Sequence, residues 1–298
     1  MKHLLKLEGM PKQAMEQILA ETKGIKAKRD VSEAKPLEGQ TWAMIFTKSS
    51  TRTRVSFEVG IRELGGSVMF LNANDMQLGR GEPIKDTARV LGRMVHGAVI
   101  RTYAQADVEK FAQFADIPTI NALTDDEHPC QILTDIFTFQ ELRGPIRGKV
   151  VTYVGDGACN VPVSWVHAAA ALGFELRIAA PAEFQPAAEI LAKAGGNIVC
   201  TEDVRAGVQG ADMVYTDVWV SMGMEAEADE RLANLAGYQI NGELMHLAKP
   251  DALVMHCLPA HRGKEIDVET FEAHADTIFT QAENRLHTQK AILAWLAG

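Results

Sequence analysis

Short apolar runs alternate with amphipathic, helix-like segments along most of this chain. In the first half, the runs cover residues 42–46, 67–71, 98–100 and 118–120. Such runs, bounded by helix-length polar segments, indicate buried parallel strands that are each returned to the sheet by a helix. The pattern therefore predicts βαβ units and argues against a sandwich or a helical bundle.

A second series of the same kind follows a break at residues 143–148, where Gly and Pro end the helical pattern of residues 130–142. Its expected strands cover residues 150–154, 176–179, 197–200, 213–216 and 252–255. In the first series, helix-like segments cover residues 52–64, 84–95 and 107–115. A length of 298 residues suits two domains. We expect an α/β protein of two doubly wound parallel-sheet domains joined near residue 145.

Charge and cysteine spacing exclude several classes of protein. The formal net charge is −9, from 30 basic and 39 acidic residues, which argues against nucleic-acid or anionic-membrane partners but permits a small basic pocket. Cys130, Cys159, Cys200 and Cys257 form no CxxC pair, so neither a zinc cluster nor a disulfide framework is indicated. No apolar leader or membrane-length apolar window is found. We expect a cytoplasmic protein.

Polar clusters follow several of the expected strands, at the positions where open α/β sheets bind small molecules. The first, Lys48-Ser49-Ser50-Thr51-Arg52-Thr53-Arg54, joins a strand to a helix. Hydroxyls, backbone N–H groups and guanidinium at a helix start favour an anion such as phosphate, although GxxxxGK[ST] is missing. The alternative is a capped helix with solvated arginines.

The second cluster is His128-Pro129-Cys130-Gln131, again between a strand and a helix. Pro129 suits the first helical turn, so that His128 and Gln131 lie one turn apart and can both address one bound group. The alternative is a histidine that caps the helix or packs in the core.

The third cluster, Gly155-Asp156-Gly157-Ala158-Cys159-Asn160, has Asn160 where GxGxxG has its third glycine. A nicotinamide cofactor is therefore not favoured, and the tight turn is expected to present the Asn160 amide to a ligand.

The last two clusters are Asp217-Val218-Trp219-Val220-Ser221-Met222-Gly223 and His256-Cys257-Leu258-Pro259. Asp217 could hold a ligand ammonium or cap a helix, and Cys257 could meet a ligand or be a small buried apolar residue. The sequence shows no Asp or His placed to activate Cys257, which argues against a thiol hydrolase.

Taken together, Ser50-Thr51-Arg52-Thr53-Arg54 and His128-Pro129-Cys130-Gln131 closely resemble the aspartate/ornithine carbamoyltransferase family. The segment from Asp217 to Gly223 and the sequence His256-Cys257-Leu258-Pro259 resemble its ornithine branch. The resemblance spans nearly the whole chain. It implies transfer of the carbamoyl group of carbamoyl phosphate to the side-chain amine of L-ornithine, giving L-citrulline and phosphate in arginine metabolism, in either the biosynthetic or the catabolic direction.

The resemblance also implies an assembly and an arrangement of domains. It implies a homotrimer or a multiple of trimers, a carbamoyl phosphate domain at residues 1–144, an ornithine domain at residues 145–283, and a helix at residues 284–298 that returns to the first domain. The active site is expected in the cleft between the domains. No redox cofactor and no metal is required.

Roles carry over residue by residue. Arg52, His128 and Cys257 are expected to be catalytic. The residues expected to bind carbamoyl phosphate are Ser50, Thr51, Arg52, Thr53, Gln77 from a neighbouring subunit, Arg101, His128, Gln131, Cys257, Leu258 and Arg285. Those expected to hold ornithine are Asn160, Asp217, Ser221 and Met222.

One departure from the family falls beside the ornithine residues. The family usually reads G-D-G-N-N, whereas Ala158 and Cys159 precede Asn160 here, as if one residue were inserted. Two alternatives stay open beside the ornithine reaction. One is carbamoyl transfer to putrescine or an acylated ornithine, and the other is a catalytically silent homologue that binds an anionic metabolite.

Overall fold

The computed structural model describes residues 1–29, 31, 34–72, 81–221 and 223–298. The chain divides into two compact units. Unit 1 consists of Met1–Phe137 and Glu283–Gly298, and unit 2 consists of Thr138–Ala282. Within the described part of the chain, no helix combines the length and the apolar character needed to cross a membrane.

Unit 1 is built on a parallel sheet in the order β2-β1-β3-β4. Its strands are β1 (Thr41–Phe46), β2 (Ser67–Asn72), β3 (Gly97–Arg101) and β4 (Thr119–Leu123). The helices with residues in this unit are α1 (Lys12–Ala27), α2 (Thr51–Glu63), α3 (Ile84–Leu91), α4 (Gln105–Ala115), α5 (Pro129–Arg143) and α12 (Ala275–Ala297). The last two helices also have residues in unit 2.

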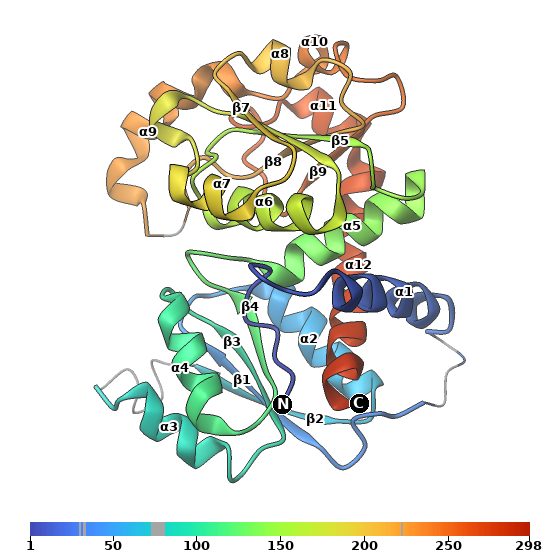
Figure 1. Ribbon diagram of the computed structural model, residues 1–298, viewed down its shortest axis with the longest axis vertical. Helices are drawn as coiled ribbons and strands as arrows, with labels where there is room; N and C mark the ends of the chain where they lie inside the picture. The colour runs from blue at the N-terminus through green and yellow to red at the C-terminus, as the bar shows by residue number, and fades with distance from the viewer. Residues whose placement is uncertain (30, 32–33, 73–80, 222) are drawn as a thin grey trace. The chain divides into compact units, whose positions relative to one another are not determined.

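Helices cover both faces of the unit 1 sheet. Figure 1 shows α3 and α4 on one side of it and α2 on the other. Alternate residues of β1 point to opposite faces. Ala43 and Ile45 join the core cluster that contains Val108 and Phe111 of α4. This double cover explains why β1 is an almost continuous apolar run.

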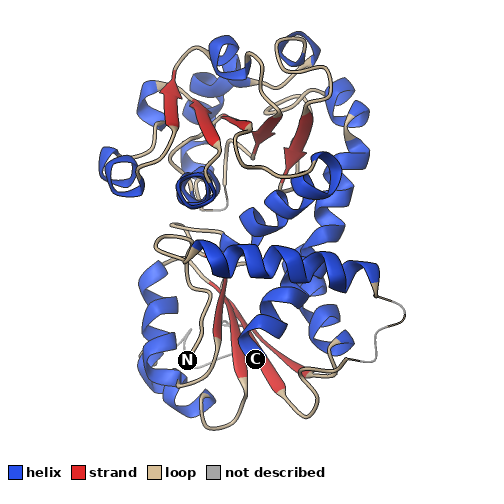
Figure 2. Ribbon diagram, turned by 45° about the vertical axis from the view of Figure 1, so that its right-hand side comes forward, coloured by secondary structure: helices blue, strands red, loops and turns tan. Residues whose placement is uncertain are grey.

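Unit 2 has a five-stranded parallel sheet in the order β7-β6-β5-β8-β9, seen between its helices in Figure 2. Its strands are β5 (Val150–Val154), β6 (Glu175–Ala179), β7 (Ile198–Thr201), β8 (Met213–Thr216) and β9 (Leu253–His256). Its α-helices are α6 (Asn160–Leu172), α7 (Ala188–Ala194), α8 (Val204–Val208), α9 (Ala228–Leu235), α10 (Gly242–Met245) and α11 (Val268–Ala273). Its 3-10 helices are η3 (Ala182–Phe184), η4 (Glu225–Glu227) and η5 (Ala236–Tyr238).

An aromatic group fills one face of the unit 2 sheet. Tyr153 of β5 and Tyr215 of β8 stack with ring centroids 6.1 Å apart, and Trp165 of α6 meets Tyr215 edge-on at 5.7 Å. On the other face, Val214 and Val254 pack in a cluster with Phe271 of α11.

Each sheet has a point where the strand order reverses, between β1 and β3 in unit 1 and between β5 and β8 in unit 2. Phe46 is level with Arg101 across the first of these points. Ligands of open α/β sheets bind beyond the carboxyl ends of the strands at such points. The segments that follow β1, β3, β5 and β8 are therefore the positions for ligand binding.

The structure confirms the predicted fold class and finds a strand at every expected run. One predicted helix is too long, because the segment expected at residues 84–95 ends as a helix at Leu91. Gly92 follows it with its backbone pressed against α4, where a Cβ at this position would lie 1.8 Å from the carbonyl oxygen of Ala115.

Candidate active site

The first turn of α2 has the charge that favours an anion. Ser50 is its N-cap and accepts a hydrogen bond from the Thr53 N–H at 3.3 Å. No acidic residue occupies the first turn, although the helix dipole would favour one there. Arg52 occupies it instead, and its buried Nε makes no hydrogen bond to any residue that the structure describes. The turn therefore combines the N–H groups of a helix start with a guanidinium whose Nε is unpaired among the described residues.

Arg285 brings a second guanidinium to the same turn from the other end of the sequence. Its Nη2 donates to Thr53 Oγ1 at 2.6 Å, and both side chains are almost completely buried. Arg101, the last residue of β3, adds a third, and its carbonyl accepts the N–H of Thr47 at 2.9 Å. Three arginines from distant segments thus belong to one edge of the unit 1 sheet.

His128 is a neutral imidazole in this setting. Burial lowers the pKa of His128 well below its ordinary value of 6.5, and the positive charges of Arg285 and Arg101 lower it further. The electrostatic effect of both arginines places them close to this ring. A neutral imidazole can donate one hydrogen bond to a carbonyl oxygen without adding charge. The Gln131 N–H donates to the carbonyl of His128 at 3.1 Å, so the two residues share the first turn of α5.

One contact beside the first turn of α2 was not predicted from the sequence. Lys48, the second residue after β1, is only 6% exposed and pairs with Asp125. Its ammonium also lies 4.3 Å from the ring centroid of Tyr103. Because Asp125 follows β4, this pair ties two of the loops at the carboxyl edge of the sheet. A lysine in a loop gives no sequence signal for such a pairing.

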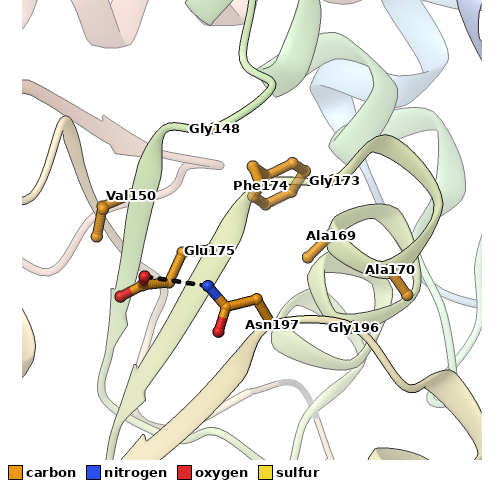
Figure 3. Close-up of a pocket in the computed structure, with 9 residues that line it drawn as sticks. All are labelled: Gly148, Val150, Ala169, Ala170, Gly173, Phe174, Glu175, Gly196 and Asn197. Atoms are coloured by element: carbon orange, nitrogen blue, oxygen red, sulfur yellow. Dashed lines mark hydrogen bonds between the residues drawn. The ribbon is translucent and has the colours of Figure 1, made fainter.

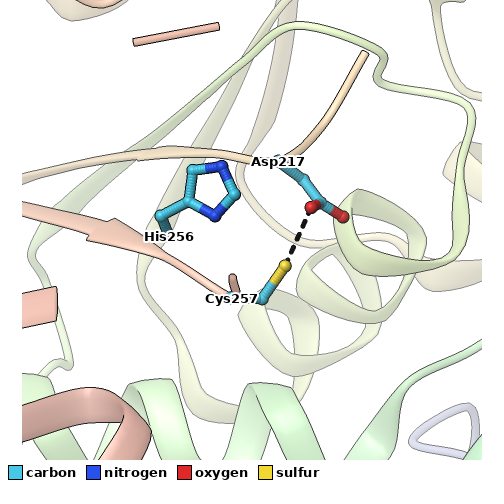
Figure 4. Close-up of side chains that lie close together, drawn as sticks. All are labelled: Asp217, His256 and Cys257. Atoms are coloured by element: carbon cyan, nitrogen blue, oxygen red, sulfur yellow. Dashed lines mark hydrogen bonds between the residues drawn. The ribbon is translucent and has the colours of Figure 1, made fainter. Parts of the chain in front are cut away.

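In unit 2, Asp217 and Cys257 meet beyond the ends of β8 and β9. The Cys257 thiol donates to Asp217 Oδ1 at 2.9 Å (Figure 4). The Val218 N–H donates to the same oxygen at 2.7 Å. Oδ2 accepts no bond from the described residues. Asp217 is not the helix cap considered above, since the segment after it is not helical. Its second oxygen is available to a ligand cation.

His256 lies beside this pair, and the ligand atoms of Asp217, His256 and Cys257 are within 4.8 Å of one another. Such a trio has the residue types of a zinc site. However, Nδ1 of His256 accepts the Leu258 N–H at 2.9 Å, and Nε2 meets Glu265 Oε1 at 3.1 Å. With Nδ1 accepting and Nε2 donating, the ring has no lone pair for a metal ion.

The buried His256–Glu265 pair shapes the turn that carries Leu258. Glu265 Oε1 also accepts the N–H of His261 at 2.5 Å. Leu258 has φ +60°, in the left-handed region that a side chain with a Cβ rarely adopts. Its N–H bond to His256 holds this conformation. Sequence patterns do not predict this role for His256 or Glu265.

The turn around Ala158, where the sequence departs from the family pattern, is held by hydrogen bonds among its own residues. Asp156 accepts the Ala158 N–H at 2.9 Å, and the Cys159 thiol donates to the carbonyl of Asp156 at 3.3 Å. Burial raises the pKa of Cys159 well above its ordinary range, and the charges of Asp156 and Asp217 raise it further. Cys159 is the N-cap of α6, so Asn160 is its first residue.

A buried ion pair joins this turn to the segment after β8. Arg231 of α9 pairs with Asp156, and its Nε donates to the carbonyl of Trp219 at 2.8 Å. Gly157 permits the close packing of the turn, because a Cβ there would lie 2.8 Å from the carbonyl oxygen of Phe184. The ion pair with Arg231 balances the charge of Asp156, whereas no cation among the described residues forms an ion pair with Asp217.

The residues singled out from the sequence therefore fall into two groups. Those in unit 1 are Ser50, Thr51, Arg52, Thr53, Arg101, His128, Gln131 and Arg285. Those in unit 2 are Asn160, Asp217, Ser221, Cys257 and Leu258. Gln77 and Met222 lie outside the described residues. All of the described residues end or follow strands or begin helices at the carboxyl edges, except Arg285, which is in the middle of α12.

Comparisons with known proteins match the whole length of this arrangement. The carbamoyl-P binding domain of the aspartate/ornithine carbamoyltransferases matches residues 2–141, and the Asp/Orn binding domain of the same family matches residues 147–296. The chain belongs to the aspartate/ornithine carbamoyltransferase family.

Individual carbamoyltransferases support this assignment. The ornithine carbamoyltransferase of Akkermansia muciniphila is 53% identical over 300 residues, which cover 100% of this chain and 98% of that protein. The solved ornithine carbamoyltransferase of Pyrococcus furiosus is 44% identical with a TM-score of 0.94, covering 100% of this chain and 97% of that one. The anabolic enzyme of Campylobacter jejuni is 41% identical with a TM-score of 0.93, and 99% of each chain is covered. The resemblance stated from the motifs is confirmed.

One surface hollow of this carbamoyltransferase lies away from all of these residues. It has a volume of about 220 Å³ and is lined in part by Gly148, Val150, Glu175 and Asn197 (Figure 3). These residues lie at or just before the starts of β5, β6 and β7, at the amino edge of the unit 2 sheet. The Asn197 amide donates to Glu175 at 3.1 Å across the hollow. The hollow lies at the opposite edge of the sheet from Asp217 and is therefore not part of the candidate site.

Glu127 links the histidine loop of the carbamoyltransferase to its N-terminal segment. The carboxylate is 3% exposed and accepts the N–H groups of Leu7 at 2.6 Å and Glu8 at 3.1 Å. Burial nevertheless dominates and raises the pKa of Glu127 from 4.5 to about 7. The folded state thus holds this proton more tightly than the unfolded state between these two pH values.

The sign of this difference means that stability falls as pH rises from about 4.5 to about 7. As the pH rises from 5 to 8, the free energy of unfolding of Glu127→Gln is expected to increase by about 3 kcal/mol relative to that of the wild type. His128 acts in the opposite direction below pH 6.5, but its contribution is common to both proteins. Urea unfolding at the two pH values measures the change, with exposed Glu38→Gln as the control. An offset that does not vary with pH would contradict it.

Proposed function

We propose that this chain transfers the carbamoyl group of carbamoyl phosphate to the side-chain amine of L-ornithine, giving L-citrulline and phosphate. The observation that carries the proposal is the edge of the unit 1 sheet, where Arg52, Arg101 and Arg285 accompany a neutral His128. These groups suit a phosphorylated ligand with an uncharged carbonyl. The names of the similar proteins point to ornithine as the acceptor.

The residues of unit 1 bind the donor and stabilise charge as it develops. We assign the phosphate to the N–H groups and hydroxyls of the first turn of α2, namely Ser50, Thr51 and Thr53, together with Arg52 and Arg101. His128 and Gln131 address the carbamoyl group, and Arg285 acts through its bond to Thr53. Preorganised donors of this kind each contribute about 3 to 4 kcal/mol to transition-state stabilisation.

The residues of unit 2 hold the acceptor. Asp217 has an oxygen that accepts no bond from the described residues and pairs with the α-ammonium of ornithine, while Asn160, Ser221 and Met222 bind the remainder of the amino acid. Cys257 and Leu258 line the reacting centre. A carboxylate next to the attacking amine would keep that amine protonated, which is why Asp217 is assigned to the α-ammonium.

The reaction balances without a further reactant. The neutral side-chain amine attacks the carbamoyl carbon, and a C–N bond forms as the carbonyl oxygen becomes an oxyanion. Arg52, Thr53 and His128 are suited to stabilise that oxyanion. The C–O bond to phosphate then breaks, and the proton lost by the amine is transferred to the departing phosphate. Arg52, Arg101 and the start of α2 stabilise the charge on the leaving group.

Three further features are part of the proposal. The carbamoyltransferase acts in the cytoplasm in arginine metabolism, and it assembles as a homotrimer to which Gln77 contributes across a subunit boundary. Exposed apolar side chains on unit 1, among them Val55 of α2 and Met69 of the edge strand β2, are consistent with a subunit contact. Light scattering of the purified protein measures the assembly, and a monomer would contradict the trimer.

A citrulline assay tests the proposed activity directly. The purified chain is supplied with carbamoyl phosphate and, in parallel, with ornithine, putrescine or N-acetylornithine. Citrulline formed from ornithine, with little product from the other two amines, is the expected result. A preference for putrescine or N-acetylornithine would change the acceptor, and no product with any amine would favour a silent homologue.

We expect kcat/KM for ornithine to rise with pH through neutrality. An amine with a pKa near 10.4 is neutral in only about one molecule in a thousand at pH 7.4, so the reactive fraction grows as the proton is lost. His128 adds no step near pH 6.5, because its pKa is lowered well below that value. Steady-state rates from pH 6 to pH 9 measure the profile. A flat profile would be the contrary outcome.

A further inference from the structure

Gln131 and Asp135 form a fully buried pair on α5. They are four residues apart on the helix, and neither side chain is exposed at all. Gln131 Nε2 donates to Asp135 Oδ1 at 2.8 Å. Residues at this spacing lie one above the other on a helix, so Asp135 contacts Gln131 from the turn that follows.

This contact decides which way the Gln131 amide faces. In the structure Nε2 is the atom that faces Asp135, because Asp135 Oδ1 accepts its hydrogen bond. The amide oxygen is therefore directed elsewhere. Gln131 Oε1 is buried and has no hydrogen-bond partner among the residues that the structure describes. Buried acceptors without partners are rare in native proteins and indicate a missing ligand or water.

The position of Gln131 identifies the donor that this oxygen needs. Its N–H bonds to the carbonyl of His128, so Gln131 belongs to the turn that addresses the carbamoyl group under the proposed function. Carbamoyl phosphate bears hydrogen-bond donors on one group alone, its NH2. Acetyl phosphate has the same phosphate and carbonyl oxygens, with a methyl group of similar size in place of that NH2. A fixed acceptor distinguishes these two ligands where size cannot.

We propose that Asp135 is a positioning residue that locks the Gln131 amide with Oε1 towards the ligand, so that the site selects carbamoyl phosphate over acetyl phosphate. The inference rests on the proposed function. Asp135 touches no substrate and acts through Gln131. Without its carboxylate, the amide is free to turn and to present its NH2 to the NH2 of the ligand.

Asp135→Asn tests this role with almost no change in volume. The asparagine can either accept from Gln131 Nε2 or donate to Oε1, so the amide is no longer held in one orientation. We expect kcat/KM for carbamoyl phosphate to fall by about tenfold or more, which is the effect of one buried hydrogen bond. The inhibition constants of acetyl phosphate and of inorganic phosphate are expected to change less than about twofold, because neither ligand uses this bond.

Matched variants keep the test decisive. Asp126→Asn makes the same change at an exposed position in the loop before His128, and it should leave all three constants unchanged. Gln131→Met removes the acceptor while preserving length, and it should reproduce the selective loss even if Asp135→Asn does not fold.

The outcomes separate the inference from the proposed function. The role of Asp135 would be overturned if kcat/KM for carbamoyl phosphate and the affinities for acetyl phosphate and inorganic phosphate fell by the same factor, or if none of them fell. Citrulline formation by the wild type would continue in either case. Absence of citrulline formation by the wild type would overturn the proposed function and the inference with it.

Discussion

Replacement of Arg52 by alanine is expected to lower kcat with carbamoyl phosphate by about 10²- to 10³-fold, the effect of removing one preorganised donor to a developing anion. Arg52 lies in the first turn of α2, where no acidic residue balances it. Its buried Nε has no hydrogen-bond partner in the described part of the chain, so its removal breaks no bond of that atom there. The melting temperature is therefore expected to change little.

Arg54 provides the matched control for this prediction. It lies on the same helix, but it is exposed and interacts with Glu58 at 3.7 Å and with the ring of Phe70. Arg54→Ala should keep near wild-type turnover under conditions in which Arg52→Ala loses it. Steady-state kinetics and thermal unfolding of both variants provide the measurement. Substantial residual activity of Arg52→Ala would remove Arg52 from the catalytic assignment.

Asp217→Asn is expected to raise the KM for ornithine by about 10²-fold or more, since removing one partner of a buried charge pair costs several kcal/mol. Asp217 is 8% exposed. Both of its internal bonds, from Val218 and Cys257, use Oδ1, which asparagine retains. The substitution thus removes the charge while leaving the local contacts in place. The KM for carbamoyl phosphate should stay close to that of the wild type.

Asp229→Asn removes a carboxylate from an exposed position on α9 and serves as the control. Initial rates over a range of ornithine concentrations, with carbamoyl phosphate saturating, separate KM from kcat. If ornithine KM were unchanged in Asp217→Asn, another group would have to hold the α-ammonium. A parallel loss of thermal stability would instead indicate that Asp217 is needed for the fold of unit 2.

The central strands could be read from the sequence because they are buried on both faces, as β3 and β8 are along their whole length. Residues 150–154 and 213–216 were expected as strands, and these are the bounds of β5 and β8. A strand covered by helices on both sides must be apolar throughout, which leaves a continuous run that is easily found. The end of α3 could not be found in this way, because it depends on the approach of Gly92 to Ala115 of α4.

The polar positions after the strands were also accessible to sequence reasoning, since open α/β sheets place ligands there. Arg285 was reached only through family resemblance, because a helix residue far along the chain has no such signal. Lys48 with Asp125, Asp156 with Arg231, and His256 with Glu265 were not found at all. The first two pairs join segments that follow different strands, and the third joins the end of β9 to the loop that follows it.

The sequence by itself determined the alternation of strands and helices, the family and the residue types of the candidate site, because these depend on local patterns and short motifs. Only the tertiary structure decided the protonation and orientation of those residues. His128 is neutral because burial and two distant arginines act on it, and the Gln131 amide faces one way because Asp135 accepts from it. A pKa and an amide orientation depend on neighbours in space, which no local pattern records.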